Sequence, residues 1–171
     1  MSLHQFSAEW NTAEDRIRLR ISTRDGQEFR FWLTRHIVAG FLSGAQSLGI
    51  ELLARQHPQE VAQAMHEFRQ QASAQQSDFS QAFMPGDHLP LGEETVLVTG
   101  FTLHQSLDHV EVEFKTASGH QVSVRINDTI LRGWVELLDK LQAMARWNLQ
   151  AAPDIGVIGP ADTPPLGRVM H

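Results

Sequence analysis

The sequence predicts an α+β fold made of two internally duplicated βββα units around a pseudo-twofold axis, with a connecting helix and an extended C-terminal tail. The stretches 15–48 and 108–141 align without a gap at an offset of 93 residues. In both, apolar residues first alternate and then recur with helical spacing. Glycines occupy equivalent positions in the two stretches, at Gly26 and Gly119 and again at Gly40 and Gly133. Duplication explains this match, and convergence of two hairpin-and-helix patterns is the alternative.

In the first unit, alternating apolar residues predict strands over 3–10, 16–23 and 27–33. A helix is expected from Thr34, because a threonine hydroxyl can accept a hydrogen bond from an unpaired amide of the first turn. Helical spacing assigns the buried stripe of this helix to Ile37, Phe41, Leu48 and Leu52.

The second unit repeats the order, with a leading strand near 95–104 and a hairpin that matches the first. Asn127 takes the capping position of Thr34. The buried stripe of the second helix is predicted at Ile130, Trp134, Leu137, Leu138, Leu141 and Ala145.

Strand register determines the hairpin loops. Ile21 can face Phe29 on the core side only if residues 24–26 form a three-residue loop with Gly26 in the left-handed conformation. A two-residue turn would shift the pairing by one and send half of the apolar side chains to the wrong face. The same reasoning predicts a loop over 117–119 with Gly119 left-handed.

Residues 56–93 are expected to connect the two units. A helix beginning at His57-Pro58 should bury Val61, Met65, Phe68 and Ala72, and a loop should cover 84–92. Residues 1–152 thus form a single domain made of repeats 1–55 and 94–150, followed by a Pro/Gly-rich tail over 153–171. The tail is expected to be a mobile terminus or an extended segment docked on its own domain or a partner.

The paired helix glycines, Gly40 and Gly133, are expected at close contacts between elements, because glycine weakens a helix interior. Either helix would then cross the other or lie on the sheet at these positions. Leucine at either site should overpack the contact.

The predicted register also defines a candidate interaction face on the first hairpin: Arg16, Arg18, Arg20, Arg30 and Trp32. It places Arg20 directly opposite Arg30, a destabilising pair that needs a counter-charge. Solvent ions, a carboxylate from this or another chain, and a phosphate are the alternatives. Glu111 and Glu113 belong to the matching outward face of the second unit. We therefore expect the acidic partner to come from a second copy or a different protein.

Composition excludes several classes of function. The chain has no cysteine, so disulfides and thiolate chemistry are absent. Its net charge of −6 disfavours a dedicated nucleic-acid binder. The start of the chain lacks a secretory signal and no apolar run is long enough to span a bilayer, so we expect a soluble cytoplasmic protein without membrane insertion. The residues show no catalytic, cofactor or metal pattern, and His57, Glu60 and His66 have the wrong spacing for one metal site.

The run RLRISTRDGQEFRFWLTR, residues 18–35, resembles small uncharacterised proteobacterial proteins that share a strand-turn-strand ending in Trp-Leu-Thr-Arg. This resemblance implies no particular activity. In architecture, the duplicated sheet-then-helix units are similar to the Whirly family of single-strand nucleic-acid binders, from which the chain departs by its acidic balance and three strands per unit.

These observations predict a non-enzymatic interaction or assembly module without a cofactor, acting as a homo-oligomer or with a protein partner. The alternative is a nucleic-acid or polyanion binder that uses the arginine and tryptophan face.

Overall fold

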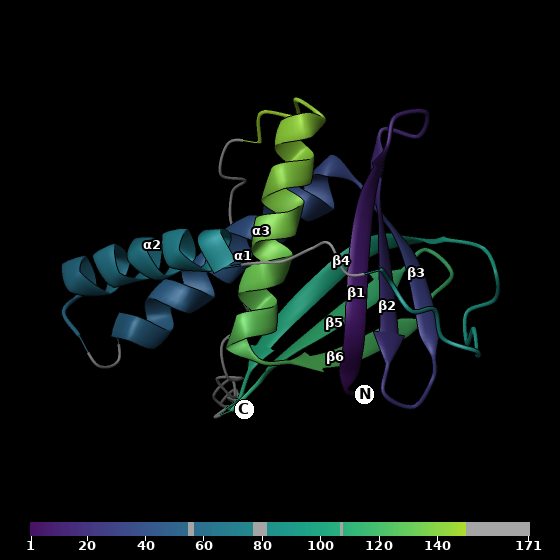
Figure 1. Ribbon diagram of the computed structural model, residues 1–171, viewed down its shortest axis with the longest axis horizontal. Helices are drawn as coiled ribbons and strands as arrows, with labels where there is room; N and C mark the ends of the chain where they lie inside the picture. Colours follow the sequence, from purple (N-terminus) through teal and green to yellow (C-terminus); the bar gives the residue numbers. More distant parts are fainter. Residues whose placement is uncertain (55–56, 77–81, 107, 150–171) are drawn as a thin grey trace, which may run out of the picture.

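The structure, a computed structural model, describes residues 1–54, 57–76, 82–106 and 108–149. It has an α+β fold with a mixed six-stranded sheet and three helices (Figure 1). The predicted tail, 153–171, lies outside the described residues. The elements are β1 (Leu3–Asn11), β2 (Arg16–Thr23), β3 (Glu28–Leu33), α1 (Arg35–Ala54), α2 (Gln59–Gln76), β4 (Val96–Gln105), β5 (Val110–Thr116), β6 (Gln121–Ile126) and α3 (Asp128–Met144).

The strands are ordered β1-β2-β3-β4-β5-β6, and neighbours are antiparallel except for the parallel pair β3 and β4. That junction is short, with Phe31 paired to Val96 and Trp32 to Leu97. At the far edges, a parallel bridge joins Ser2 to Arg125, whose amide donates to the Met1 carbonyl at 2.9 Å. The sheet therefore curves until its first and last strands meet at one end.

Both predicted hairpins are confirmed. Ile21 pairs with Phe29, and Phe114 pairs with Val122. Gly26 and Gly119 have φ angles of 77° and 83°, the left-handed conformation that the three-residue loops require.

The predicted N-caps are also present. Thr34 Oγ1 accepts a hydrogen bond from the Ile37 amide at 3.3 Å, and Asn127 Oδ1 accepts one from the Ile130 amide at 2.9 Å. Most of the predicted stripes are buried, namely Ile37, Phe41, Leu48, Trp134, Leu138 and Leu141. Ile130, Leu137 and Ala145 are only half-buried, and the side chain of Leu52 is not described.

An aromatic cluster forms the centre of the core. Trp134 of α3 contacts Phe6 of β1, Phe41 of α1 and Phe114 of β5, with ring centroids 5.6 to 6.1 Å apart. Phe31 of β3 lies 5.1 Å from Phe114. Side chains from both halves of the sheet and from two helices thus share one core.

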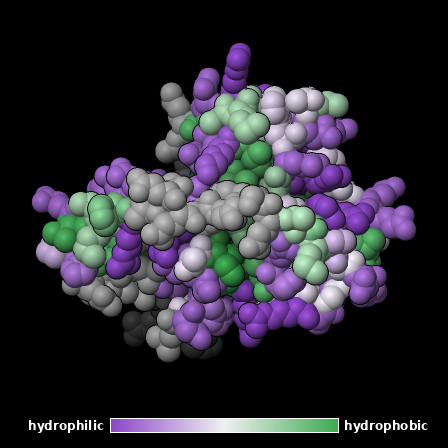
Figure 2. Space-filling model, viewed as in Figure 1, coloured by the Kyte–Doolittle hydropathy of each residue, from purple (hydrophilic) through white to green (hydrophobic). Residues whose placement is uncertain are grey.

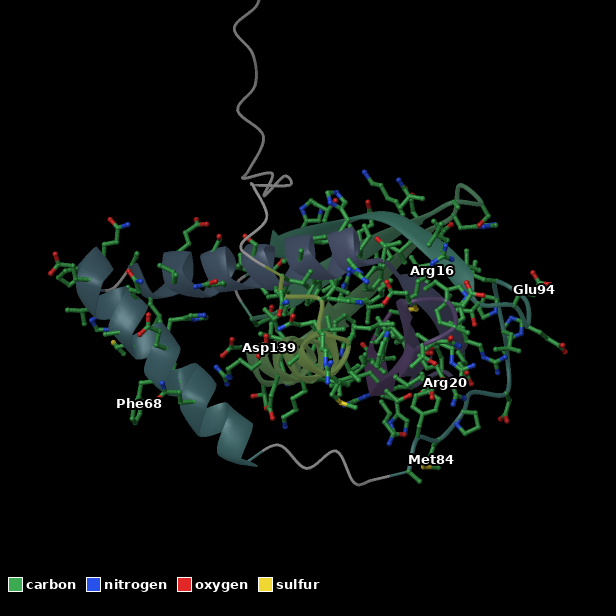
Figure 3. All side chains as sticks on the ribbon, turned by 90° about the horizontal axis from the view of Figure 1, so that it is seen from above. Arg16, Arg20, Phe68, Met84, Glu94 and Asp139 are labelled. Carbon is green, nitrogen blue, oxygen red and sulfur yellow. The ribbon has the colours of Figure 1, made fainter. Side chains whose placement is uncertain are left out.

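Helix α1 begins over the sheet and extends beyond it, where it pairs with α2 (Figures 1 and 3). The predicted inward face of α2 is wrong at two of its four positions, Val61 and Phe68. Met65 is half-buried, and the side chain of Ala72 is not described. Val61 and Phe68 are exposed by 44% and 72%, whereas Ala62 is fully buried. None of the described helices is long and apolar enough to cross a membrane.

Candidate functional site

The predicted interaction face lies on the outer side of β2 and β3, with Arg20 opposite Arg30 and Arg18 opposite Trp32 as the register required. Trp32 is half-buried. Each arginine has an acidic neighbour in the first hairpin or in the strand and turn that precede it. Arg16 pairs with Glu14 at 3.8 Å, Arg18 with Glu9 at 2.5 Å, and Arg20 and Arg30 both with Glu28.

Glu28 supplies the counter-charge that the sequence led us to expect from another chain. Its Oε1 accepts hydrogen bonds from Arg20 Nε at 3.0 Å and from Arg30 Nε at 2.8 Å. Its Oε2 accepts one from the Gly86 amide at 3.2 Å. The expectation of an intermolecular carboxylate is therefore wrong, because a fully buried side chain of the same hairpin already separates the two guanidinium groups.

The environment of Glu28 favours its charged form. Burial raises the pKa of this carboxyl, but the hydrogen bonds and positive charges of Arg30 and Arg20 lower it more. The pKa consequently lies below its ordinary value. At neutral pH the cluster is an anion held between two cations, with no proton available for acid catalysis.

Residues 82–93, which we call the cover segment, close over this cluster. Phe83 lies on Arg20, with the guanidinium carbon 4.2 Å from the ring centroid, and the Glu93 carbonyl accepts a hydrogen bond from Arg30 Nη1 at 3.0 Å. Gln5 of β1 holds the start of the segment: its amide group donates to the Ala82 carbonyl at 3.0 Å and accepts from the Met84 amide at 2.8 Å. Figure 3 shows Arg20 close to this segment.

Gly86 sits where the cover segment crosses the first hairpin. A Cβ there would lie 2.6 Å from the Gly26 carbonyl oxygen and 2.8 Å from the Glu28 nitrogen, both backbone atoms. Two backbone hydrogen bonds join the cover segment to the hairpin beside this point. The Glu28 amide donates to the His88 carbonyl at 2.8 Å, and the His88 amide donates to the Gly26 carbonyl at 3.1 Å. Only glycine allows this approach.

The paired helix glycines lie in packed surroundings. Gly40 is buried in α1. In α3, a Cβ on Gly133 would lie 3.5 Å from Phe6 Cζ, an ordinary van der Waals distance. The overpacking expected from leucine at these positions remains a prediction.

A small cavity of about 70 Å³ lies among α1, α2 and α3. Its lining includes Gly49, His66, Asp128 and Arg132. Burial lowers the pKa of His66 although the charges of Asp128 and Glu67 act in the opposite direction, so the ring is neutral at pH 7. Its Nε2 is buried and has no hydrogen-bond partner in the described residues. Ligand pockets usually exceed about 300 Å³, so this space suits helix packing better than a substrate.

A second surface, which the sequence did not identify, lies on the outer side of α2. We call it the α2 face: Glu60, Val61, Ala64, Met65, Phe68 and Arg69, which line a shallow groove of about 420 Å³. In the view of Figure 2, hydrophobic atoms gather at the left end of the molecule, where Figure 1 places α2. Figure 3 shows Phe68 pointing away from the rest of the protein.

The helical periodicity of Val61, Met65 and Phe68 predicted one continuous apolar stripe on this helix. Periodicity alone does not decide whether such a stripe faces the core or the solvent, and here Val61 and Phe68 face the solvent. The residues that pack inward are instead Ala62, which is buried, and His66, which fills the space beside Gly49.

The described residues contain no group of three or more histidine, aspartate or glutamate side chains suited to a metal ion. Comparisons with protein-family models, with curated proteins and with solved structures found no match to the chain.

Proposed function

We propose that this protein is a non-enzymatic interaction module that presents the α2 face to another protein surface. The observation that carries the proposal is the exposure of that face. Four large apolar side chains are prominently exposed in the described part of the chain, and two of them, Val61 and Phe68, lie about two helical turns apart on one side of α2. Contiguous apolar surface of this kind is characteristic of protein contacts.

Charge pairing weakens the alternative of polyanion binding. All four arginines of the predicted face have carboxylate neighbours, and Arg20 and Arg30 are also partly covered by residues 82–93. Nucleic-acid affinity depends on positive charge that is free to replace counterions. The arginine cluster therefore serves better as an attachment for the cover segment.

A photo-crosslinking residue placed at Phe68 in the host cell tests the proposal. We expect a protein adduct at position 68 that disappears when Val61→Glu is added. The matched control is Gln63, which is exposed on another side of α2 and should give no adduct. Absence of an adduct at 68, or equal adducts at 63 and 68, would overturn the proposal.

We also propose that the units 1–55 and 94–150 descend from a duplication and are related by a pseudo-twofold axis. Support comes from the cross-strand pairs of the two hairpins, which are equivalent at the offset of 93 residues. Leu19 pairs with Phe31 in the first hairpin, and Val112 pairs with Val124 in the second. Distant relatives provide the test. Common descent predicts that the two units of a relative share residues beyond simple alternation, whereas convergence predicts alternation alone.

The cytoplasmic location expected from the sequence stays a prediction.

A further inference from the structure

Helix α2 is held to the rest of the protein by few buried side chains. Of its described side chains, only Ala62 is buried, Met65 and His66 are half-buried, and the others are exposed. An element with few buried apolar contacts opens at a small cost in free energy. A modest change at one contact can therefore decide whether α2 stays docked.

His66 is the contact at which α2 comes closest to the backbone of α1. A Cβ on Gly49 would lie 2.5 Å from His66 Nδ1, so the imidazole ring lies directly on the α1 backbone. The ring also borders the small cavity among the three helices. Its Nε2 is buried and has no hydrogen-bond partner in the described residues. Water can surround this ring only if α2 leaves α1 or the side chain rotates outward.

The charged groups around His66 come from α2 and α3. They are Glu67 and Arg69 on α2, and Asp128 and Arg132, which form an ion pair, on α3. The α1 residues that line the cavity are uncharged: Ala45, Gln46, Gly49 and Leu53. The cavity also borders the first turn of α3, where the helix dipole is positive. A charged imidazolium here would meet two arginines and this dipole, and one of the two carboxylates is already paired.

Protonation of His66 therefore opposes docking of α2. An imidazolium would place a charge and a further N–H donor in the helix interface, with no acceptor for Nε2. Burial, together with the charges of Arg132 and Arg69, holds the pKa of His66 below its ordinary value of 6.5, against the opposite effect of Asp128 and Glu67. Release of α2 would restore the ordinary value. Docking is thus fully favoured above about pH 6.5 and weakens as the pH falls from there through the docked pKa.

We propose that α2 is an acid-released element: protonation of His66 frees α2 from α1 and α3 and uncovers the apolar side chains beneath it. Among these are Leu53 and Leu131, which line the cavity and are buried while α2 is docked. This inference goes beyond the proposed function and does not depend on what the α2 face binds. The device responds to mild acid, in which the rest of the fold stays intact.

Hydrogen exchange of the full chain at pH 7.5 and pH 5.5 tests the proposal, with the protection of each amide corrected for its intrinsic exchange rate. The amides of α2 should lose about threefold or more of their protection at the lower pH. Those of β2 and β5 should keep theirs. The pKa of Glu28 lies below 4.5, so this carboxylate stays charged at both pH values and the sheet serves as an internal reference.

His66→Gln removes the titrating group, so the protection of α2 should become equal at the two pH values. The matched control is His36→Gln, at an exposed position of α1, which should keep the full response. Because glutamine can itself weaken docking, a second variant leaves His66 in place. Arg69→Gln removes a positive charge that lowers the pKa of His66, and it should reduce the loss of protection in acid.

Equal protection of α2 at both pH values in the parent would overturn this inference, as would a loss that survives in His66→Gln. If α2 of His66→Gln is unprotected at both pH values, an unreduced loss in Arg69→Gln decides against the proposal. An imidazole that titrates with its ordinary pKa while α2 stays protected also contradicts it, because the ring then rotates outward and the helix stays in place. Equal losses in α2, β2 and β5 would indicate global unfolding and refute a local release.

Discussion

Glu28 resolves the one electrostatic conflict in the first hairpin. Arg20 and Arg30 face each other across β2 and β3, and one buried carboxylate oxygen accepts a hydrogen bond from each. The sequence contains part of this answer, because Glu28 shares the face of Arg30 by strand alternation. Its burial could not be predicted, since it depends on the path of residues 82–93, which no periodicity specifies.

Glu28→Gln should destabilise the protein by about 2 to 3 kcal/mol, because it leaves two adjacent arginines without a carboxylate. Denaturant unfolding at neutral pH measures the loss. The matched control is Glu9→Gln, which removes the exposed ion pair with Arg18 and should cost less than about 1 kcal/mol. Equal losses in the two variants would contradict the role of burial.

The same carboxylate makes stability dependent on pH. The pKa of Glu28 is lower in the folded protein than its ordinary value of 4.5, so the unfolded chain binds more protons in mild acid. Its stabilising contribution is present above about pH 4.5 and is lost as the pH falls through the lower folded pKa. Unfolding free energies measured between neutral and acidic pH should therefore fall less steeply for Glu28→Gln than for the parent. Identical slopes would refute this linkage.

Gly86→Ala should detach the cover segment, because its new methyl group would overlap backbone atoms of the first hairpin. Hydrogen exchange should then show loss of protection at the amides of Glu28 and His88, which pair across this contact. Gly100→Ala is the control, since a Cβ at Gly100 meets nothing within 4 Å. Retained protection at both amides in Gly86→Ala would show that the segment accommodates a side chain.

At the scale of elements, the two hairpins were more predictable than the inward face of α2. Each hairpin carries two independent signals, alternation and a loop glycine, and both give one register. Helix α2 carries one signal, the apolar stripe of Val61 and Phe68, and that stripe is exposed. The inner side of α2 is instead made of Ala62 and His66, and His66 packs closely against Gly49 of α1. Neither an alanine nor a histidine adds to an apolar stripe in the sequence, so this inner side gave no signal.

Gly133 offers a direct test of how α3 meets β1. Gly133→Ala should stabilise the protein by up to about 1 kcal/mol, because alanine favours helix and its Cβ would reach Phe6 at 3.5 Å. Gly133→Leu should instead cost about 1 to 3 kcal/mol by pushing Phe6 away from Trp134. Thermal unfolding of the alanine and leucine variants, each compared with the parent, measures the two changes in stability. Similar melting temperatures for the leucine variant and the parent would exclude a close contact.

At the scale of the whole molecule, the two halves of the sheet depend on a common core more than on their junction. Strands β3 and β4 are joined by only two residue pairs, whereas Phe31 of the first half packs on Phe114 of the second. Trp134 then connects Phe114 to Phe6 and Phe41. Neither half could bury its aromatic side chains alone, so we expect one cooperative unit.

Native-state hydrogen exchange tests this cooperativity. The most protected amides of β2 and of β5 should report the same free energy of unfolding, because both are released only when the shared core opens. Phe31→Leu removes the ring contact with Phe114 and should lower both values equally, by about 1 kcal/mol. A control on the surface, Lys115→Gln, should lower neither. If Phe31→Leu reduces protection in β2 and β3 but leaves β5 and β6 unchanged, the halves unfold separately and the single-domain interpretation is wrong.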